Sequence, residues 1–155
     1  MAYDLPGHGL STGERAAIDD FMCYRQVLSD AFKVVADFGL PARRVGLAQS
    51  TGCAVLMSHL LSGGDADFER VVLLAPLLKP CDWWWGKPAH SLLKYFIHSL
   101  PRKFADNSDD QLFLEFLRER DPLQARFLPL SWVGALKKWQ TWFHRQQPVP
   151  SSLMI

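Results

Sequence analysis

The chain has 155 residues, of which 48% are apolar and 21% charged, a composition typical of a folded globular domain rather than a disordered segment. Its 17 Lys and Arg nearly balance its 16 Asp and Glu, so charge gives no reason to expect a nucleic-acid partner. The three cysteines lack the paired spacing of a zinc site, and we expect neither a metal nor an organic cofactor. No apolar run is long enough to span a membrane, and the first residues do not resemble a secretory signal. These features predict a cytoplasmic protein.

The first half of the chain alternates between helical and extended patterns. Residues 1–4 are expected to end a strand, and the Gly- and Pro-rich stretch at 6–13 is expected to form a loop. From Asp19, apolar residues recur at three- and four-residue spacing, which predicts a helix that Gly39 ends. A strand, a helix and a strand are then expected at residues 43–49, 51–61 and 70–75. This order predicts an α/β fold with a parallel sheet and right-handed crossovers.

After Pro76 the pattern changes. Residues 79–147 show no clear strand but contain several helical runs, near residues 88–100, 109–120 and 131–144. All six Trp of the chain lie in this region, which favours either a small domain with its own core or a lid over an apolar pocket. We therefore expect three parts: a core, a helical cap and the start of a further core strand, at residues 1–78, 79–147 and 148–155.

The cap contains the conspicuous stretch CDWWWGKP. Three adjacent Trp cannot all face one way on a helix, so at least one is expected to be exposed or to border a cavity. Contact with an acyl chain or a membrane surface is one interpretation, and packing inside a small domain is the other. The candidates are Trp83, Trp84 and Trp85. Further along, Phe113, Phe116, Leu117 and Arg120 fit an amphipathic helix, whose Phe residues are expected to belong to the core.

The stretch LAQSTGCAV places Ser50 between the second expected strand and its helix. Ser is a preferred N-cap residue, so helix capping is the plainest interpretation. However, a sharp turn from a parallel strand into a helix also presents its residue at the carboxyl edge of the sheet, where ligands bind. Ala48 and Gly52 are the small residues that such a turn needs. The sequence A-Q-S-T-G is therefore a near match to the nucleophile elbow G-x-S-x-G, and Ser50 is a candidate nucleophile.

A second motif lies upstream. DLPGHGLSTG, at residues 4–13, resembles the D-x-P-G-H-G-x-S loop that precedes the nucleophile strand in many α/β-hydrolases. With A-Q-S-T-G and the helical insertion in the same order, the chain resembles the lysophospholipase and monoacylglycerol lipase branch of that superfamily. The residues of the motif are Asp4, Pro6, Gly7, His8, Gly9 and Ser11.

This resemblance implies a partial α/β-hydrolase sheet with a helical cap, and a serine hydrolase that cleaves carboxylic esters of lipids. Ser50 would attack the ester carbonyl, and the backbone N–H of Thr51 would stabilise the oxyanion. Gly7 and Gly9 would permit a tight turn, and His8 would be a hydrogen-bonded loop residue rather than a proton carrier. A small lipid ester is the implied partner, with peripheral contact to membranes or lipid aggregates.

Three elements that the resemblance requires are not found within the sequence. The first oxyanion donor would precede Met1, and the catalytic acid and base would follow Ile155. The chain is thus expected to begin inside one strand, to end inside another, and to have at most trace activity by itself. The internal residues that could replace the acid and base are Asp82, His90, His98 and His144, but they lie in the insertion rather than at strand ends. His59 is expected to project away from the Ser50 hydroxyl.

Two other functions stay open. A peptidase of the same fold, which cuts after an N-terminal residue, is close in chemistry to the esterase. An incomplete or degenerate hydrolase that binds lipid, or pairs with a complementary chain without catalysis, is the non-enzymatic alternative.

Overall fold

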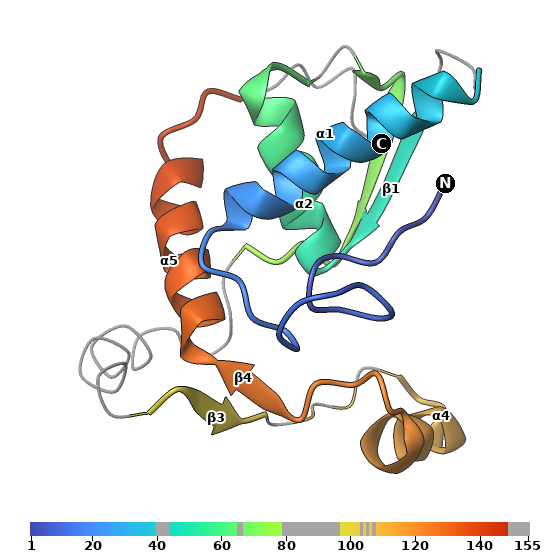
Figure 1. Ribbon diagram of the computed structural model, residues 1–155, viewed down its shortest axis with the longest axis vertical. Coiled ribbons are helices and arrows are strands. Elements are labelled where there is room, and N and C mark those ends of the chain that lie inside the picture. The colour runs from blue at the N-terminus through green and yellow to red at the C-terminus, as the bar shows by residue number, and fades with distance from the viewer. Residues whose placement is uncertain are drawn as a thin grey trace. The chain divides into compact units, whose positions relative to one another are not determined.

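The structure is a computed structural model (Figure 1). It describes residues 1–39, 44–64, 67–78, 97–102, 104, 106 and 108–148. The chain divides into two compact units. Unit 1 comprises Met1–Asp19 and Lys87–Ala135, and unit 2 comprises Asp20–Gly86 and Leu136–Ile155.

Unit 2 begins with helix α1, Phe21–Asp37. The carboxylate of the N-cap residue Asp20 accepts a hydrogen bond of 2.9 Å from the Met22 N–H, which satisfies one of the N–H groups that a helix leaves free in its first turn. The helix ends before Gly39, whose φ of +66° lies in the left-handed region. The predicted helix and its stop signal are confirmed. The buried face of α1 consists of Phe21, Tyr24, Leu28 and Val35.

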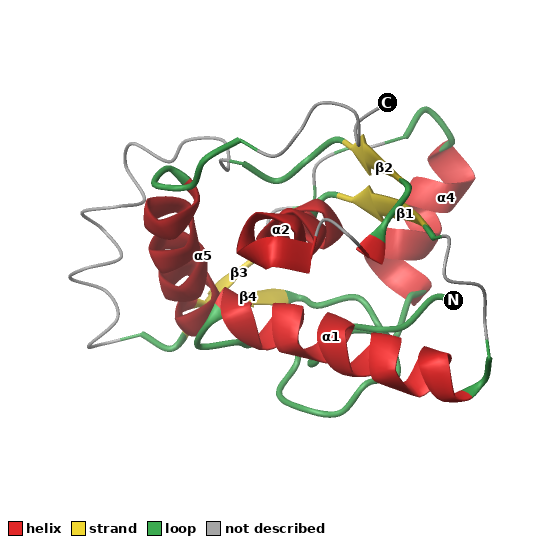
Figure 2. Cartoon of the chain, turned by 90° about the horizontal axis from the view of Figure 1, so that it is seen from above, coloured by secondary structure: helices red, strands yellow, loops and turns green. Residues whose placement is uncertain are grey.

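A strand, a helix and a strand follow α1. Strands β1, Val45–Gln49, and β2, Arg70–Leu74, pair in parallel from Val45 opposite Arg70 to Gln49 opposite Leu74. Helix α2, Thr51–His59, forms the crossover and continues into a short segment, η1, Leu60–Gly64. Figures 1 and 2 show α1 and α2 on the same side of the strand pair, where α2 packs against both α1 and β1. The predicted parallel α/β arrangement is confirmed, with element ends shifted by one or two residues.

The core of unit 2 includes a buried polar link to helix α5, Leu130–Phe143. Trp139 lies in the part of α5 that belongs to unit 2, and its ring centroid is 5.9 Å from that of Phe21. The Trp139 indole N–H donates to the hydroxyl of Ser58 at 2.6 Å, and that hydroxyl donates to the Ala54 carbonyl at 2.7 Å. Both side chains are almost fully buried, so each hydrogen bond satisfies a group that water cannot reach.

Unit 1 contains a two-stranded antiparallel ladder. Strand β3, Ser99–Pro101, pairs with β4, Phe127–Pro129, with Leu100 opposite Leu128. The expectation that residues 79–147 contain no strand is therefore wrong, as is the helical assignment for 99 and 100. Strands of three residues are too short to show the alternation from which a strand is recognised in a sequence.

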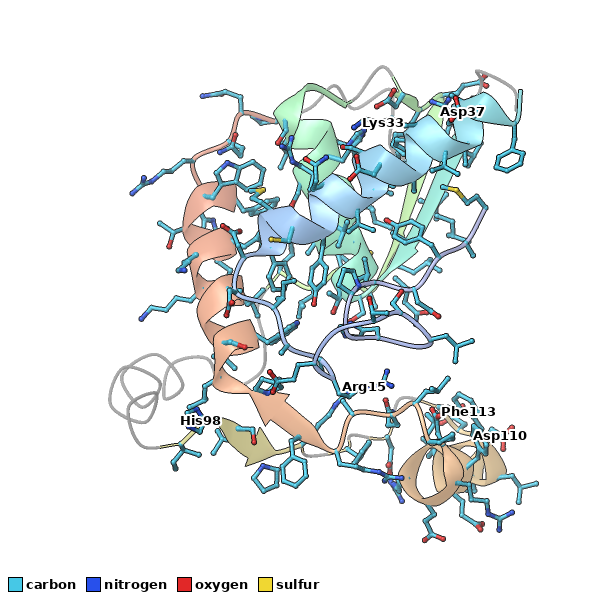
Figure 3. The ribbon with its side chains drawn as sticks, viewed as in Figure 1. Arg15, Lys33, Asp37, His98, Asp110 and Phe113 are labelled. Carbon is cyan, nitrogen blue, oxygen red and sulfur yellow. The ribbon has the colours of Figure 1, made fainter. Side chains whose placement is uncertain are left out.

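The helical part of unit 1 is short. It consists of α4, Gln111–Glu115, and η3, Phe116–Arg120. The carboxylate of Asp110 caps α4 by accepting a hydrogen bond of 3.1 Å from the Phe113 N–H, and Figure 3 shows both residues at the start of the helix. Leu114 is buried, but Phe113 and Phe116 are 45% and 46% exposed. The predicted helix is confirmed, whereas the expectation that its Phe residues belong to the core is wrong, because Leu114 occupies the buried face.

The remaining secondary-structure predictions concern the start of the chain, the helix at 131–144 and several segments that the structure does not describe. Residues 1–4, expected to end a strand, are irregular in the structure. The expected helix at 131–144 is confirmed as α5. The triple Trp stretch, most of the expected helix at 88–100 and the strand expected near the end of the chain lie outside the described residues.

The Trp139–Ser58 link provides a test of the core. Ser58→Ala leaves the buried indole N–H without its acceptor, so we expect it to lower the free energy of unfolding by about 1–3 kcal/mol. The double variant Ser58→Ala, Trp139→Phe should lose less than the sum of the two single variants, since neither polar group then remains to be satisfied. Urea denaturation measures these differences. Ser62→Ala, at an exposed position, is the control and should change stability by less than about 0.5 kcal/mol. Strict additivity would show that the two side chains are not coupled.

Candidate functional site

The main-chain conformation of Ser50 is unusual. Its φ is 50° and its ψ is −116°, a region that non-glycine residues enter only at a cost of about 1–3 kcal/mol. It stands directly between the last residue of β1 and the first residue of α2, yet its side chain makes no capping hydrogen bond. The residue is exposed. The hydroxyl is thus not used to cap the helix, which was the plainest interpretation of the sequence.

Main-chain hydrogen bonds hold Ser50 in this conformation. Its N–H donates to the carbonyl of Leu74 at 3.0 Å, and its carbonyl accepts from the N–H groups of Leu77 at 3.2 Å and Cys53 at 3.1 Å. Ala75 also has a positive φ, of 44°. The chain beyond β2 therefore bends at Ala75. It passes directly beside the strand-to-helix turn at residues 49–51, which we call the serine turn.

The spacing of small residues around the turn follows from how closely α2 approaches β1. A Cβ placed on Gly52 would lie 3.8 Å from the Cβ of Ala48, which is an ordinary contact distance. A Cβ on Gly46 would lie only 3.0 Å from a ring carbon of Phe68 and 3.1 Å from a methyl of Leu56. Of these two glycines, the more tightly packed is therefore Gly46, before the A-Q-S-T-G motif, and not Gly52 within it.

The backbone of Thr51 provides a hydrogen-bond donor beside Ser50. Thr51 is the first residue of α2, so its N–H has no partner within the helix. No acceptor for this N–H is found within the part of the chain that the structure describes. The positive end of the helix dipole also lies at this point. An exposed hydroxyl next to such a donor could attack a carbonyl carbon while the donor binds the oxygen that becomes negative.

The sequence motif in unit 1 forms a loop that hydrogen-bonds to itself. A carboxylate oxygen of Asp4 accepts from the Leu10 N–H at 2.9 Å, and the Ser11 hydroxyl donates to the main-chain carbonyl of Asp4 at 2.7 Å. Gly9 has a φ of +49°, and a Cβ there would lie 2.2 Å from the Asp4 carboxylate. The loop therefore requires glycine at this position.

The first glycine and the histidine of the loop have similar local roles. Gly7 has a φ of +73°, and a Cβ there would lie 2.4 Å from the carbonyl oxygen of Glu14. The Gly7 N–H donates to the Thr12 carbonyl at 3.0 Å. Nδ1 of His8 is 3.1 Å from the Pro6 carbonyl oxygen, so this nitrogen carries a proton and donates. Within unit 1, the arrangement is that of a tight structural loop.

His59 lies in unit 2 and is almost fully buried, with 7% of its surface exposed. Its Nε2 is 2.6 Å from a carboxylate oxygen of Asp67, and its ring packs edge-on against Phe32. The guanidinium of Arg44 is 3.8 Å from the other carboxylate oxygen of Asp67. His59 therefore links the end of α2 to the segment before β2, rather than serving as a partner for the serine.

The internal residues considered as substitutes for the acid and base gain no support. Asp82 and His90 lie outside the described residues. The His98 carbonyl accepts from the Leu130 N–H at 2.9 Å, and the ring of His144 lies against Phe143. Within the described ranges there is no group of three His, Cys, Asp or Glu side chains that could hold a metal ion. The helices described there are all too short or too polar to cross a membrane.

Cys53 lies beside the turn but is not among the site residues predicted from the sequence. Its thiol is fully buried and lies 3.2 Å from the Ala48 carbonyl oxygen and 3.3 Å from that of Leu74. Cys53 follows Ser50 by three residues and lies in the first turn of α2. Its closeness to Ser50 in the sequence could have marked it as a residue of the site. That its thiol also faces the Leu74 carbonyl follows from the pairing of β2 with β1.

A parallel strand pair, a crossover helix and a strained serine at their junction are together the arrangement of an α/β-hydrolase, and this is the fold of the chain. The family model described as "Serine aminopeptidase, S33" matches residues 1–151, and the chain belongs to this family. Among solved structures it is similar to the crystal structure of the monoacylglycerol lipase of Paleococcus ferrophilus, with a TM-score of 0.72 at 17% sequence identity. The similarity covers 94% of this chain and 56% of the lipase chain. No curated protein matches the sequence significantly.

The two glycines near the turn give a matched pair of variants. Gly46→Ala forces Phe68 or Leu56 to move, and we expect a loss of about 1–3 kcal/mol in the free energy of unfolding. Gly52→Ala meets only an ordinary contact and reduces the freedom of the unfolded chain, so we expect no loss and a gain of up to about 1 kcal/mol. Thermal and urea unfolding measure both. An equal loss in the two variants would contradict the conclusion that Gly46 is the more tightly packed of the two glycines.

Proposed function

We propose that this chain contains the nucleophile of a serine hydrolase that cleaves carboxylic esters of lipids, with Ser50 as the attacking residue. The observation that carries this proposal is the left-handed backbone of Ser50 at the end of β1, with a hydroxyl that is exposed and not used as a helix cap. A serine that only caps a helix has an extended backbone and an occupied hydroxyl. Strain of this kind is expected where a side chain must be presented to a substrate.

The proposed chemistry assigns one role to each residue of the turn. The Ser50 oxygen attacks the ester carbonyl and loses its proton to a base, which gives that proton to the departing alcohol as an acyl-enzyme forms. Water then hydrolyses the acyl-enzyme, which releases the carboxylic acid and restores the serine. The Thr51 N–H binds the oxyanion in the transition state. The loop of Asp4, Gly7 and Gly9 has a structural role, and His8 takes no part in proton transfer.

A lipid ester is the substrate class that we favour. The structural similarity to a monoacylglycerol lipase supports it, and so does the concentration of Trp in the region expected to form the cap. In this proposal Trp83, Trp84 and Trp85 contact the acyl chain. Peripheral contact of the cap with a lipid surface belongs to the same proposal.

Aminopeptidase activity is the second candidate function, because the matching family is described by that activity. Ester and peptide hydrolysis share the nucleophile and the oxyanion donor, so Ser50 and Thr51 would have the same roles. The two candidates differ in the group next to the scissile carbonyl. An aminopeptidase needs a carboxylate or carbonyl group to bind the free amino terminus of its substrate, whereas a lipase needs an apolar channel.

The nucleophile can be tested with a fluorophosphonate, followed by mass analysis of the modified peptide. The 155-residue chain covers 56% of the lipase chain. We therefore compare the labelling and activity of this chain with those of a longer polypeptide, the joined polypeptide, in which the remaining elements of the fold are fused to it. The short chain should show only the residual rate expected without a complete triad, about 10³–10⁴ over water. The joined polypeptide should be labelled at Ser50 and should hydrolyse monoacylglycerol faster than an aminoacyl amide.

Two variants control this experiment. Ser50→Ala should abolish labelling and hydrolysis, whereas His59→Gln, which keeps a donor toward Asp67, should leave both nearly unchanged. Labelling of another serine, or full activity in Ser50→Ala, would refute the assignment of the nucleophile. Preference for the aminoacyl amide would favour the peptidase, and an unlabelled joined polypeptide would favour a non-catalytic hydrolase fold.

A further inference from the structure

The thiol of Cys53 is a buried side-chain donor next to the serine turn. It is fully shielded from solvent and lies within 3.3 Å of two main-chain carbonyl oxygens. One is that of Ala48, near the end of β1, and the other is that of Leu74, the last residue of β2. The thiol thus bridges the ends of the two paired strands, directly beneath the turn.

The carbonyl of Leu74 is shared by two donors. It accepts the Ser50 N–H at 3.0 Å and lies 3.3 Å from the Cys53 sulfur. The Cys53 N–H, in turn, donates to the Ser50 carbonyl at 3.1 Å. Ser50, Cys53 and Leu74 therefore form a closed set of contacts in which movement of one group affects the other two. A strained residue keeps its conformation only if its surroundings hold it.

We propose that Cys53 is a positioning residue for the serine turn. Its thiol donates to the carbonyl groups of Ala48, near the end of β1, and Leu74, at the end of β2, and so holds the main chain of Ser50 and the adjacent Thr51 N–H in place. The single thiol proton is shared between the two acceptors or alternates between them. An effect of Cys53 on the reactivity of Ser50 rests on the proposed function. An effect of Cys53 on the main-chain conformation of the turn does not depend on it.

The ionisation of the thiol agrees with this role. Burial raises the pKa of the Cys53 thiol above its ordinary value, because the thiolate would lose its hydration there. The group therefore keeps its proton at neutral pH and can donate. For the same reason it is a poor nucleophile, since only the thiolate reacts readily. Cys53 supports the turn without competing with the serine for a substrate.

A pair of conservative variants separates hydrogen bonding from simple packing. Cys53→Ser keeps a donor in a smaller side chain, and Cys53→Ala removes the donor at nearly the same volume as Ser. A residue that only fills space should tolerate Ala at least as well as Ser, because Ala introduces no buried hydroxyl. A residue that positions the turn by donation should tolerate Ser better than Ala.

The main-chain effect is measured by amide hydrogen exchange in the 155-residue chain. The reporters are the N–H groups of Ser50 and Leu77, and that of Leu28 in α1 is the internal reference. In Cys53→Ala, exchange at both reporters should accelerate relative to Leu28 by about two- to tenfold, the effect of losing one ordinary hydrogen bond. In Cys53→Ser the ratio should stay within about twofold of the parent chain. Equal acceleration in the two variants, equal acceleration at Leu28, or no acceleration would overturn the proposal.

The catalytic effect is measured as the rate of phosphonate labelling at Ser50 in the joined polypeptide. Cys53→Ala should slow labelling by about two- to tenfold, and Cys53→Ser should restore most of the rate. A labelling rate in Cys53→Ala equal to that of the parent would refute a catalytic consequence of the thiol. If the parent itself is not labelled, the proposed function fails, while the exchange ratios still decide whether Cys53 holds the turn.

Discussion

The left-handed backbone of Ser50 is the constraint on which the arrangement of the candidate site depends. A non-glycine residue in this region costs about 1–3 kcal/mol and persists only if neighbouring groups hold it. Those groups come from β2, whose last carbonyl accepts the Ser50 N–H, and from Leu77 just beyond, whose N–H binds the Ser50 carbonyl. Parallel pairing places Leu74 opposite Gln49, directly beside the turn. The second strand is therefore part of the site, although it contributes no reactive side chain.

Packing along α2 provides the stability that offsets this strain. In the second half of the helix, Leu56 packs closely on β1 at Gly46, where Phe68 from the segment before β2 also makes contact. Further along, the hydroxyl of Ser58 joins the helix to Trp139 of α5. These contacts hold the second half of the helix, and in its first turn the Cys53 thiol lies within 3.3 Å of the carbonyl oxygens of Ala48 and Leu74. Because the strain is local and the packing is spread over many contacts, the turn can remain strained in a stable unit.

Some polar groups around the turn have hydrogen-bond partners and others do not. The Ser50 N–H and carbonyl and the buried thiol all have partners, while the Ser50 hydroxyl makes no capping hydrogen bond. The Thr51 N–H has no acceptor among the described residues. Preorganised donors contribute most to catalysis when they need not reorganise as charge develops. A rigid turn with one hydroxyl and one adjacent N–H available suits addition to a carbonyl group.

The sequence alone determined the features that depend on neighbours along the chain. The spacing of apolar residues predicted α1, the strand–helix–strand order and α5, and the Gly and Pro residues of DLPGHGLSTG predicted a loop. It also identified Ser50 and Thr51 at a strand-to-helix junction, but not whether the hydroxyl caps the helix. Only the tertiary structure decided that the Ser50 hydroxyl does not cap the helix. It also decided which groups share the Leu74 carbonyl and that β3 pairs with β4. Each of these features joins groups far apart in the sequence, and the periodicity of one segment contains no information about which distant main-chain group will face it.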